Sequence, residues 1–483
     1  MPAPILVDRS KTIRWIAWLI VFYIFLLMIE GALRKWVAPR FSDPILVIRD
    51  PVLIAIYFLA WRGRMFPRNA YVISLFAIGL LSLAFSIYFL ASFLPWFWVG
   101  VVTLYGFRSN FLHMPLIFIM AKIFDEKDVK RIGWWVLLAM VPLCLLMVAQ
   151  FHASPDSFIN RTAGLGEGEQ ITAGGGKIRP PATFSFISGP IFYCAMAAAF
   201  LVYGILTRGT YKAWLLIASG VALVVAVAVS GSRGCVLSVA LVFSMILLIF
   251  VLRPNAVNQV GRLFLIGIAA AFIIARLPVF SQGIDILSER FTSASEEQES
   301  SLVVGLLHRV GSEFTEGFKN LNKFPATGWG LGIGTNVGAH YLIGGPGFLL
   351  SENEWTRILY ESGPFLGLAF ILWRTILALN LGYLSFSALK RGSTLPLLLL
   401  SSAFFVLLNG QLGQPTTLGF AVVLSGLCLA SVQKGTETNG VSAGISGNEL
   451  KIPVPAPRPL PRRSAYASRL HGEADQGNRG IDQ

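Results

Sequence analysis

The chain has 483 residues, of which 55% are hydrophobic and only 13% are charged, and its formal net charge is +14. Soluble chains carry about 25% charged residues, so the composition excludes a soluble protein of several domains. Twelve membrane spans of about 20 residues would take up about 240 residues, roughly half of the chain. The positive charge is spread over loops and both termini, which favours contact with membrane lipid over nucleic-acid binding.

Apolar segments, taken in chain order, predict an all-α polytopic membrane protein with about 12 transmembrane helices. The first run, at 15–29, has no small-residue cleavage site behind it, so we expect a retained span rather than a signal peptide. The twelve segments lie near residues 13–33, 44–61, 71–93, 96–121, 133–152, 187–206, 213–229, 235–252, 262–280, 357–386, 394–409 and 416–432.

Lysine and arginine are concentrated in alternate connections between these segments. The short turns at 94–95 and 410–415 contain neither residue type, which marks them as outer turns. Arg34, Lys35 and Arg40 are an exception, because they fall on the outer side. The pattern as a whole places both termini in the cytoplasm.

This topology gives residues 1–432 as the transmembrane domain. It has a first outer loop at 153–186 and a large outer loop at 281–356, between the ninth and tenth spans. Residues 433–483 are polar, basic and rich in proline, so we expect a disordered cytoplasmic tail. Apolar residues at helical spacing predict an amphipathic helix in the large loop: Val303, Leu307, Val310, Phe314, Phe318 and Leu321.

The four cysteines lie in or beside apolar runs. Their spacing fits neither a metal site nor a disulfide framework. The chain also has no P-loop and no Asp-x-Asp diphosphate motif. We therefore expect neither a metal nor another cofactor, and no soluble nucleotide donor.

Charged residues within or beside spans need a partner or a function, because burying a charge in a bilayer is costly. Glu30 and Arg34 are spaced for a structural pair on one helix. Arg49 and Asp50 are neighbours that point about 100° apart, so they predict two interhelical pairs or part of a polar cavity. Arg108 has no acidic neighbour in sequence, so an interhelical pair and a cavity role are both open.

The turn Ser-Gly-Ser-Arg-Gly at 230–234 opens the eighth span. Its glycines permit close approach of a ligand, and its arginine could bind a phosphate or diphosphate bidentately. The alternative is an ordinary tight turn whose Arg233 reaches the membrane surface. The alternating glycines at 328–334 follow no strand and do not match a dinucleotide fingerprint, so they predict a pliable loop.

The tenth span starts with a cluster of charges. Glu354, Arg357 and Glu361 are spaced i, i+3 and i+7 and share one helix face, with Glu352 just before them. One interpretation is a salt-bridge ladder. The other is a carboxylate base beside a cation at the outer membrane surface.

These motifs, in this order, resemble the O-antigen ligase and polysaccharide polymerase family of bacterial inner membranes. The resemblance covers roughly residues 10–430. Its features are the turn 230–234, the segment 179–184 that begins with Arg179, Arg309 in the large loop, the segment 325–334, and Glu352-Asn353 followed by Glu361-Ser362-Gly363.

The resemblance implies a metal-independent, inverting glycosyl transfer at the inner membrane of a bacterial cell. The donor would be a glycan on undecaprenyl diphosphate, and the acceptor a saccharide hydroxyl in exopolysaccharide or O-antigen synthesis. Ligases of the family have a histidine before the asparagine of the last motif, where this chain has Glu352. That difference favours polymerisation over ligation. Machinery for polysaccharide export or chain-length control would be a partner.

Residue roles follow from the same resemblance. Arg233 and Arg309, with Arg357 as a third candidate, would hold the diphosphate. Glu352, or in its place Glu354, would deprotonate the acceptor. Four further candidates are Arg108, Arg179, His308 and Glu361, and His308 could replace the missing ligase histidine.

Two alternatives of other classes stay open. A flippase for lipid-linked oligosaccharides would also need cations in a cavity, but it should show paired halves with broken helices, and no internal repeat is visible. A catalytically silent scaffold of an export complex would not need Arg233, Arg309 and Glu352.

Overall fold

The structure is a computed structural model, and it describes residues 9–163, 172–174, 176–252, 315–323, 325–335, 338–339, 342, 351 and 353–432. These residues belong to one compact unit, Met1–Glu437. The predicted span at 262–280, most of the loop 281–356 and the tail 433–483 lie outside the described residues.

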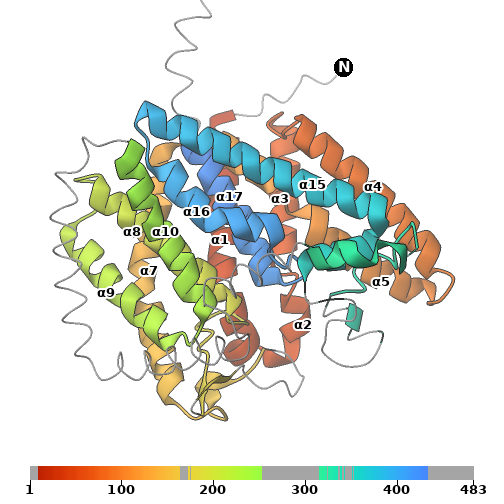
Figure 1. Cartoon of the computed structure of the whole chain (residues 1–483), viewed down its shortest axis with the longest axis horizontal. Coiled ribbons are helices and arrows are strands. Elements are labelled where there is room, and N and C mark those ends of the chain that lie inside the picture. The colour runs from red at the N-terminus through yellow and green to blue at the C-terminus, as the bar shows by residue number, and fades with distance from the viewer. Residues whose placement is uncertain are drawn as a thin grey trace, which may run out of the picture. The chain divides into compact units, whose positions relative to one another are not determined.

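The described part of the chain is mainly helical (Figure 1). Its longer helices are α1 (Arg9–Ala32), α3 (Arg49–Arg62), α4 (Ala70–Leu90), α5 (Trp96–Phe107), α6 (Leu116–Ile123), α7 (Glu126–His152), α8 (Ser188–Leu206), α9 (Ala213–Val229), α10 (Arg233–Leu252), α15 (Glu354–Arg391), α16 (Leu395–Asn409) and α17 (Pro415–Val432). Its short elements are η1 (Leu33–Val37), η2 (Pro39–Phe41), α2 (Ser42–Ile45), η3 (Arg108–Leu112), η4 (Phe158–Asn160), β1 (Thr172–Gly174), β2 (Lys177–Ile178) and η6 (Glu316–Lys323).

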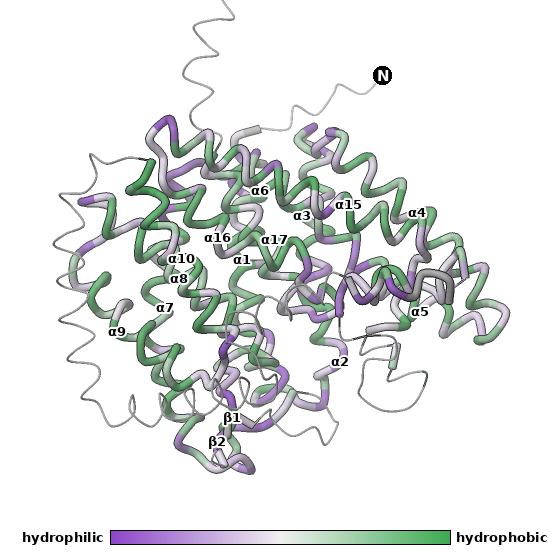
Figure 2. Tube along the Cα trace, viewed as in Figure 1, coloured by the Kyte–Doolittle hydropathy of each residue, from purple (hydrophilic) through white to green (hydrophobic). Residues whose placement is uncertain are grey.

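Within the described residues, 8 helical segments are long and apolar enough to cross a membrane, and α9 and α16 are shorter apolar helices. The prediction of an all-α membrane protein is therefore confirmed. Large hydrophobic side chains such as Trp18, Leu80 and Val251 lie exposed on the helices, as lipid-facing surfaces require. Figure 2 shows the helices as mainly hydrophobic, whereas hydrophilic residues gather in the connections. The count of twelve stays a prediction, because the ninth segment is not described.

The predicted span at 96–121 is not one continuous helix. The helix α5 ends at Phe107, the π-helix η3 follows, and α6 begins only at Leu116. Pro115 precedes α6, and proline removes a backbone donor and is favoured at the start of a helix rather than inside it. The break brings the polar residues of η3 into the protein interior, where Arg108, Ser109 and Asn110 are buried.

The helix α15 folds back on itself at Gly363, whose φ of 75° and ψ of 170° are not helical. Glycine adopts such angles readily because it has no Cβ. Beyond the bend, a Cβ at Gly367 would lie 3.0 Å from the carbonyl oxygen of Ile358, so the two parts of α15 pack closely. The fold-back also brings Arg374 to the first residue of the helix, 20 positions earlier.

The centre of the described structure is α17, which is buried along nearly its whole length. It packs against α1, α6, α7, α8, α15 and α16. All four cysteines are buried and free.

The segment 153–186 contains a small two-stranded sheet. The strands β1 and β2 pair in antiparallel register, with Thr172 opposite Ile178 and Gly174 opposite Lys177. The predicted amphipathic helix of the large loop is described only in η6, a 3₁₀ helix. There Phe318 packs edge-on against Trp355 of α15, with ring centroids 6.3 Å apart.

Candidate functional site

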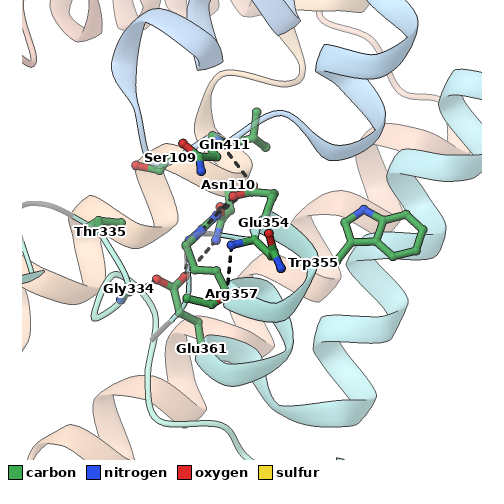
Figure 3. A network of polar contacts seen from close by, with 12 residues as sticks. Ser109, Asn110, Gly334, Thr335, Glu354, Trp355, Arg357, Glu361 and Gln411 are labelled. Atoms are coloured by element: carbon green, nitrogen blue, oxygen red, sulfur yellow. Dashed lines mark hydrogen bonds and ion pairs between the residues drawn. The ribbon is translucent and has the colours of Figure 1, made fainter. Parts of the chain in front are cut away.

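The charges at the start of α15 form a buried network, which we call the α15 network (Figure 3). Glu354, Arg357 and Glu361 share one helix face, as their spacing predicted, and all three are buried. Arg357 Nε donates to Glu354 Oε2 over 2.9 Å, and Arg357 Nη1 donates to Glu361 Oε2 over 2.6 Å. The predicted salt-bridge ladder is therefore present.

A second arginine completes this network. Arg374 Nη1 donates to Glu354 Oε1 over 2.8 Å, and its other nitrogens donate to the carbonyls of Leu407 and Gly410. Glu354 Oε1 also accepts from Arg357 Nη2 at 3.0 Å and from the Leu412 amide at 3.2 Å. Two guanidinium groups and one amide thus engage both oxygens of Glu354. A carboxylate held in this way is stabilised in its charged form and is a poor proton acceptor.

Two distant segments add contacts to the α15 network. Arg357 Nη2 donates to Asn110 Oδ1 in η3 over 2.8 Å, and the Gly334 amide donates to Glu361 Oε1 over 2.9 Å. Figure 3 shows Asn110 and Gly334 approaching Arg357 and Glu361 from separate ribbons. The break in the fourth predicted span therefore brings Asn110 to the network as a hydrogen-bond acceptor.

The alternating glycines of 328–334 form a docked loop, which corrects the prediction of a pliable one. The amides of Trp329 and Gly330 donate to the carbonyls of Tyr360 and Glu361 over 2.7 and 3.0 Å. Gly328 has a φ of 75°, and a Cβ there would lie 2.4 Å from the Glu361 carbonyl oxygen. Glycine is needed because the backbones meet.

A further group of buried charges joins α1, α3 and the residues around η3. Arg49 Nε bonds to Glu30 Oε2 over 3.1 Å, and Arg108 Nε bonds to Asp50 Oδ2 over 2.5 Å. His113 Nε2 lies 3.1 Å from Asp50 Oδ1. The adjacent Arg49 and Asp50 thus pair with different segments, as predicted, and Arg108 makes an interhelical pair.

The predicted pair between Glu30 and Arg34 is wrong. Glu30 pairs with Arg49, whereas Arg34 donates to the backbone carbonyl and hydroxyl of Ser42 and to the hydroxyl of Ser185. The following π-helix η1 changes the direction of the Arg34 side chain relative to a regular α-helix. Lys35 is also buried and donates to the carbonyls of Ala182 and Phe184.

The turn 230–234 packs against the segment that contains β1 and Arg179. Gly231 has a φ of 55°, and a Cβ there would lie 2.6 Å from Ala173 Cβ and 3.7 Å from Arg179 Cγ. The structure therefore brings the backbone beside Arg233 close to the stem of Arg179, although some 50 residues separate them. Both arginines are half-buried.

Three predicted site residues, Glu352, Arg309 and His308, lie outside the described residues. The neighbour of Glu352 is described: Asn353 precedes α15, its side-chain amide donates to Glu316 Oε2 in η6, and its carbonyl accepts from the Arg357 amide.

Sequence reasoning missed Arg374, Asn110 and His113. Arg374 was detectable, because a charge inside an apolar span is a signal by itself. His113 was detectable in the same way, because it lies inside the predicted span 96–121. Asn110 is uncharged and gave no such signal.

Among the described residues, no cluster of three or more His, Cys, Asp or Glu side chains could hold a metal ion. The chain was also compared with models of protein families and with curated proteins, and neither comparison finds a match.

Proposed function

We propose that this protein is a membrane glycosyltransferase of the polysaccharide polymerase type. It would transfer a glycan from undecaprenyl diphosphate to a saccharide hydroxyl in exopolysaccharide or O-antigen synthesis. The resemblance of the motifs supports this proposal. The observation that carries it is the contact between two of those motifs: the segment 325–334 docks on Tyr360 and Glu361 of α15, in the motif that ends at Gly363.

We assign the acceptor base to Glu352 rather than Glu354. Protonating Glu354 would remove the negative charge that Arg357 and Arg374 contact, and would leave both buried guanidiniums without it. Glu354 is better suited to hold the start of α15 in place. Glu352 comes two residues before Glu354 in the sequence and is not part of this network of ion pairs.

We assign binding of the donor diphosphate to Arg233 and Arg309. Arg179, beside the 230–234 turn, is a further cation. Arg357 is a weaker candidate, because two carboxylates and one amide already engage its guanidinium. Arginine binds phosphate oxygens bidentately and stays charged, which suits a leaving diphosphate.

The reaction then requires no cofactor. Glu352 takes the proton of the acceptor hydroxyl as its oxygen attacks the anomeric carbon of the donor. The bond from that carbon to the diphosphate oxygen breaks, and the lipid diphosphate leaves with the electron pair. Attack from the opposite face inverts the anomeric configuration. The arginines stabilise the charge that develops on the diphosphate.

The predicted topology supports the same proposal. The distribution of lysine and arginine favours cytoplasmic termini and loops 153–186 and 281–356 outside the inner membrane. A donor of this class presents its head group on that side. Export or chain-length machinery would receive the product there.

A flippase is the second candidate, and one observation favours it. The group around Asp50, Arg108 and His113 places several charges inside the helical region, and intramembrane charges often line transport paths. A ligase that uses a lipid or protein acceptor is the third candidate.

Deletion of the gene and analysis of the lipid-linked glycan separates these candidates. Single unpolymerised repeats on the lipid indicate a polymerase, full-length unattached chains a ligase, and donor facing the cytoplasm a flippase. In the purified protein, Glu352→Gln should lower turnover about 10²–10⁴-fold with donor binding retained. Glu354→Gln is the matched control, and a lower fold stability is expected there. Full turnover in Glu352→Gln would contradict the assignment of the base.

A further inference from the structure

An open surface cavity of about 640 Å³ lies between the start of α7 and the connection from α8 to α9. It shares no residue with the α15 network or with the 230–234 turn. Figure 1 shows α7, α8 and α9 as neighbours, and the three helices pack against one another. The residues that line it and that matter here are Lys130, Arg131, Trp134, Trp135, Arg208 and Tyr211.

The inner wall of this cavity is built by Tyr211. Its ring is buried, and its hydroxyl donates to the Lys130 carbonyl over 3.0 Å. Two glycines make room for the ring: a Cβ would lie 2.3 Å from the hydroxyl at Gly133 and 2.4 Å from a ring carbon at Gly204. The connection from α8 to α9 is therefore fixed against α7, and the cavity is part of the folded structure.

The cavity carries positive charge. Lys130 is paired with Glu126, with 2.7 Å between Nζ and Oε1. Arg131 and Arg208 are exposed, and within the described part of the chain neither has an acidic side chain within 4.0 Å. Two arginines thus present their planar guanidinium groups to one cavity, which suits an anion with several oxygens.

The apolar part of the cavity continues along the helices. Trp134 and Trp135 meet edge to face with ring centroids 4.8 Å apart, and Trp135 is 59% exposed. Along the same two helices, Leu145 of α7 and Ile217 of α9 are also exposed. Tryptophan is enriched at the membrane–water interface, so the cavity has the composition of a site at head-group depth above a lipid-facing apolar surface.

We infer that this cavity binds the head group of an anionic phospholipid. The phosphate lies against Arg131 and Arg208, and the acyl chains follow the exposed apolar faces of α7 and α9. Free phosphate shares the cationic contacts but has nothing to place on the apolar surface. Basic cavities between helices on the cytoplasmic side are typical sites for anionic lipid head groups, and the charge pattern predicts that side here.

The test compares lipid binding to the full-length protein in detergent by native mass spectrometry. Phosphatidylglycerol is the probe and phosphatidylcholine the neutral reference. Each arginine near anionic lipid is expected to contribute about fivefold in affinity. Arg131→Gln with Arg208→Gln should therefore weaken phosphatidylglycerol binding about 25-fold and leave phosphatidylcholine binding unchanged. If the double variant does not fold, Arg208→Gln alone can be used, because Arg208 lies in a surface connection. It should weaken phosphatidylglycerol binding about fivefold.

The matched control removes two exposed arginines at the ends of α3 and α15, by Arg62→Gln with Arg391→Gln. Retained binding in this control supports the cavity, and an equal loss would show general charge attraction and overturn the inference. Equal binding of both lipids to the unchanged protein would overturn it as well. Displacement of phosphatidylglycerol by glycerol 3-phosphate at equal concentration would assign the site to a soluble phosphate instead.

Discussion

Removing Arg374 should destabilise the protein more than removing any exposed arginine. Its guanidinium is fully buried and bonds to Glu354 Oε1 and to the carbonyls of Leu407 and Gly410. Arg374→Met keeps a long apolar stem of similar length and removes all of these bonds. The part of α15 before Gly363 would lose its ion pair with the part after Gly363. The end of α16 would lose its hydrogen bonds to Arg374.

The expected cost follows from what the substitution leaves behind. Breaking a buried ion pair by removing one partner costs about 3–5 kcal/mol, because the remaining charge stays buried. Glu354 keeps its bonds to Arg357 and to the Leu412 amide, which favours the lower end of this range of cost. The carbonyls of Leu407 and Gly410 each lose a donor, which adds about 1–3 kcal/mol per carbonyl. We therefore expect a loss of at least about 3 kcal/mol in the free energy of unfolding.

The measurement is unfolding of the purified protein in mixed micelles as the fraction of denaturing detergent rises. Arg391→Met is the control, because Arg391 is an exposed residue of the same helix that bonds to Ser387, and its change should stay within about 0.5 kcal/mol. The double variant with Glu354→Gln should cost less than the sum of the two single variants, by about 0.5–3 kcal/mol. Additive costs, or an Arg374→Met protein as stable as the unchanged one, would refute a role for this ion pair.

Three further predictions concern the bend, the turn and the topology. Gly363→Ala should cost about 1–3 kcal/mol from its backbone conformation alone, and the new Cβ would also clash, 2.2 Å from the Ala326 carbonyl oxygen. Gly382→Ala is the control: it lies inside the same helix with no atom within 4 Å of the new Cβ, so it should not destabilise and should stabilise by about 0.5–1 kcal/mol in detergent unfolding. Arg233→Lys keeps the charge but loses the two-pronged donor, so glycan transfer should fall strongly, and full activity with unchanged donor affinity would make the turn structural. Reporter fusions at residues 166 and 297 should be active only with a reporter that works outside the cytoplasm, and cytoplasmic activity at either position would contradict the topology.

The sequence was most informative where one helix determines the geometry. The spacing of Glu354, Arg357 and Glu361 predicted their common face, and the adjacency of Arg49 and Asp50 predicted partners on different segments. Both predictions depend only on 100° of rotation per residue, which tertiary packing does not change.

Contacts that depend on a break in a helix were not predictable in this way. Gly363-Pro364 is a dipeptide that marks turns, yet the apolar pattern runs through it, so Arg374 seemed far from Glu354. The same applies to Asn110, which reaches Arg357 only because α5 ends early. Glu30 shows the opposite case. Its favourable local partner, Arg34, was predicted, but the structure pairs Glu30 with the more distant Arg49.

The balance of charge in the α15 network limits where chemistry can take place. It joins two carboxylates, Glu354 and Glu361, to two guanidiniums, Arg357 and Arg374, so its formal charges cancel. A neutral, fully bonded group of this kind attracts a diphosphate weakly and releases or accepts a proton with difficulty. Its suitable role is to fix the start of α15 against η3, the glycine loop and the end of α16. In the proposed reaction, the cations that bind the anionic donor and the carboxylate that takes the acceptor proton would therefore lie outside this network.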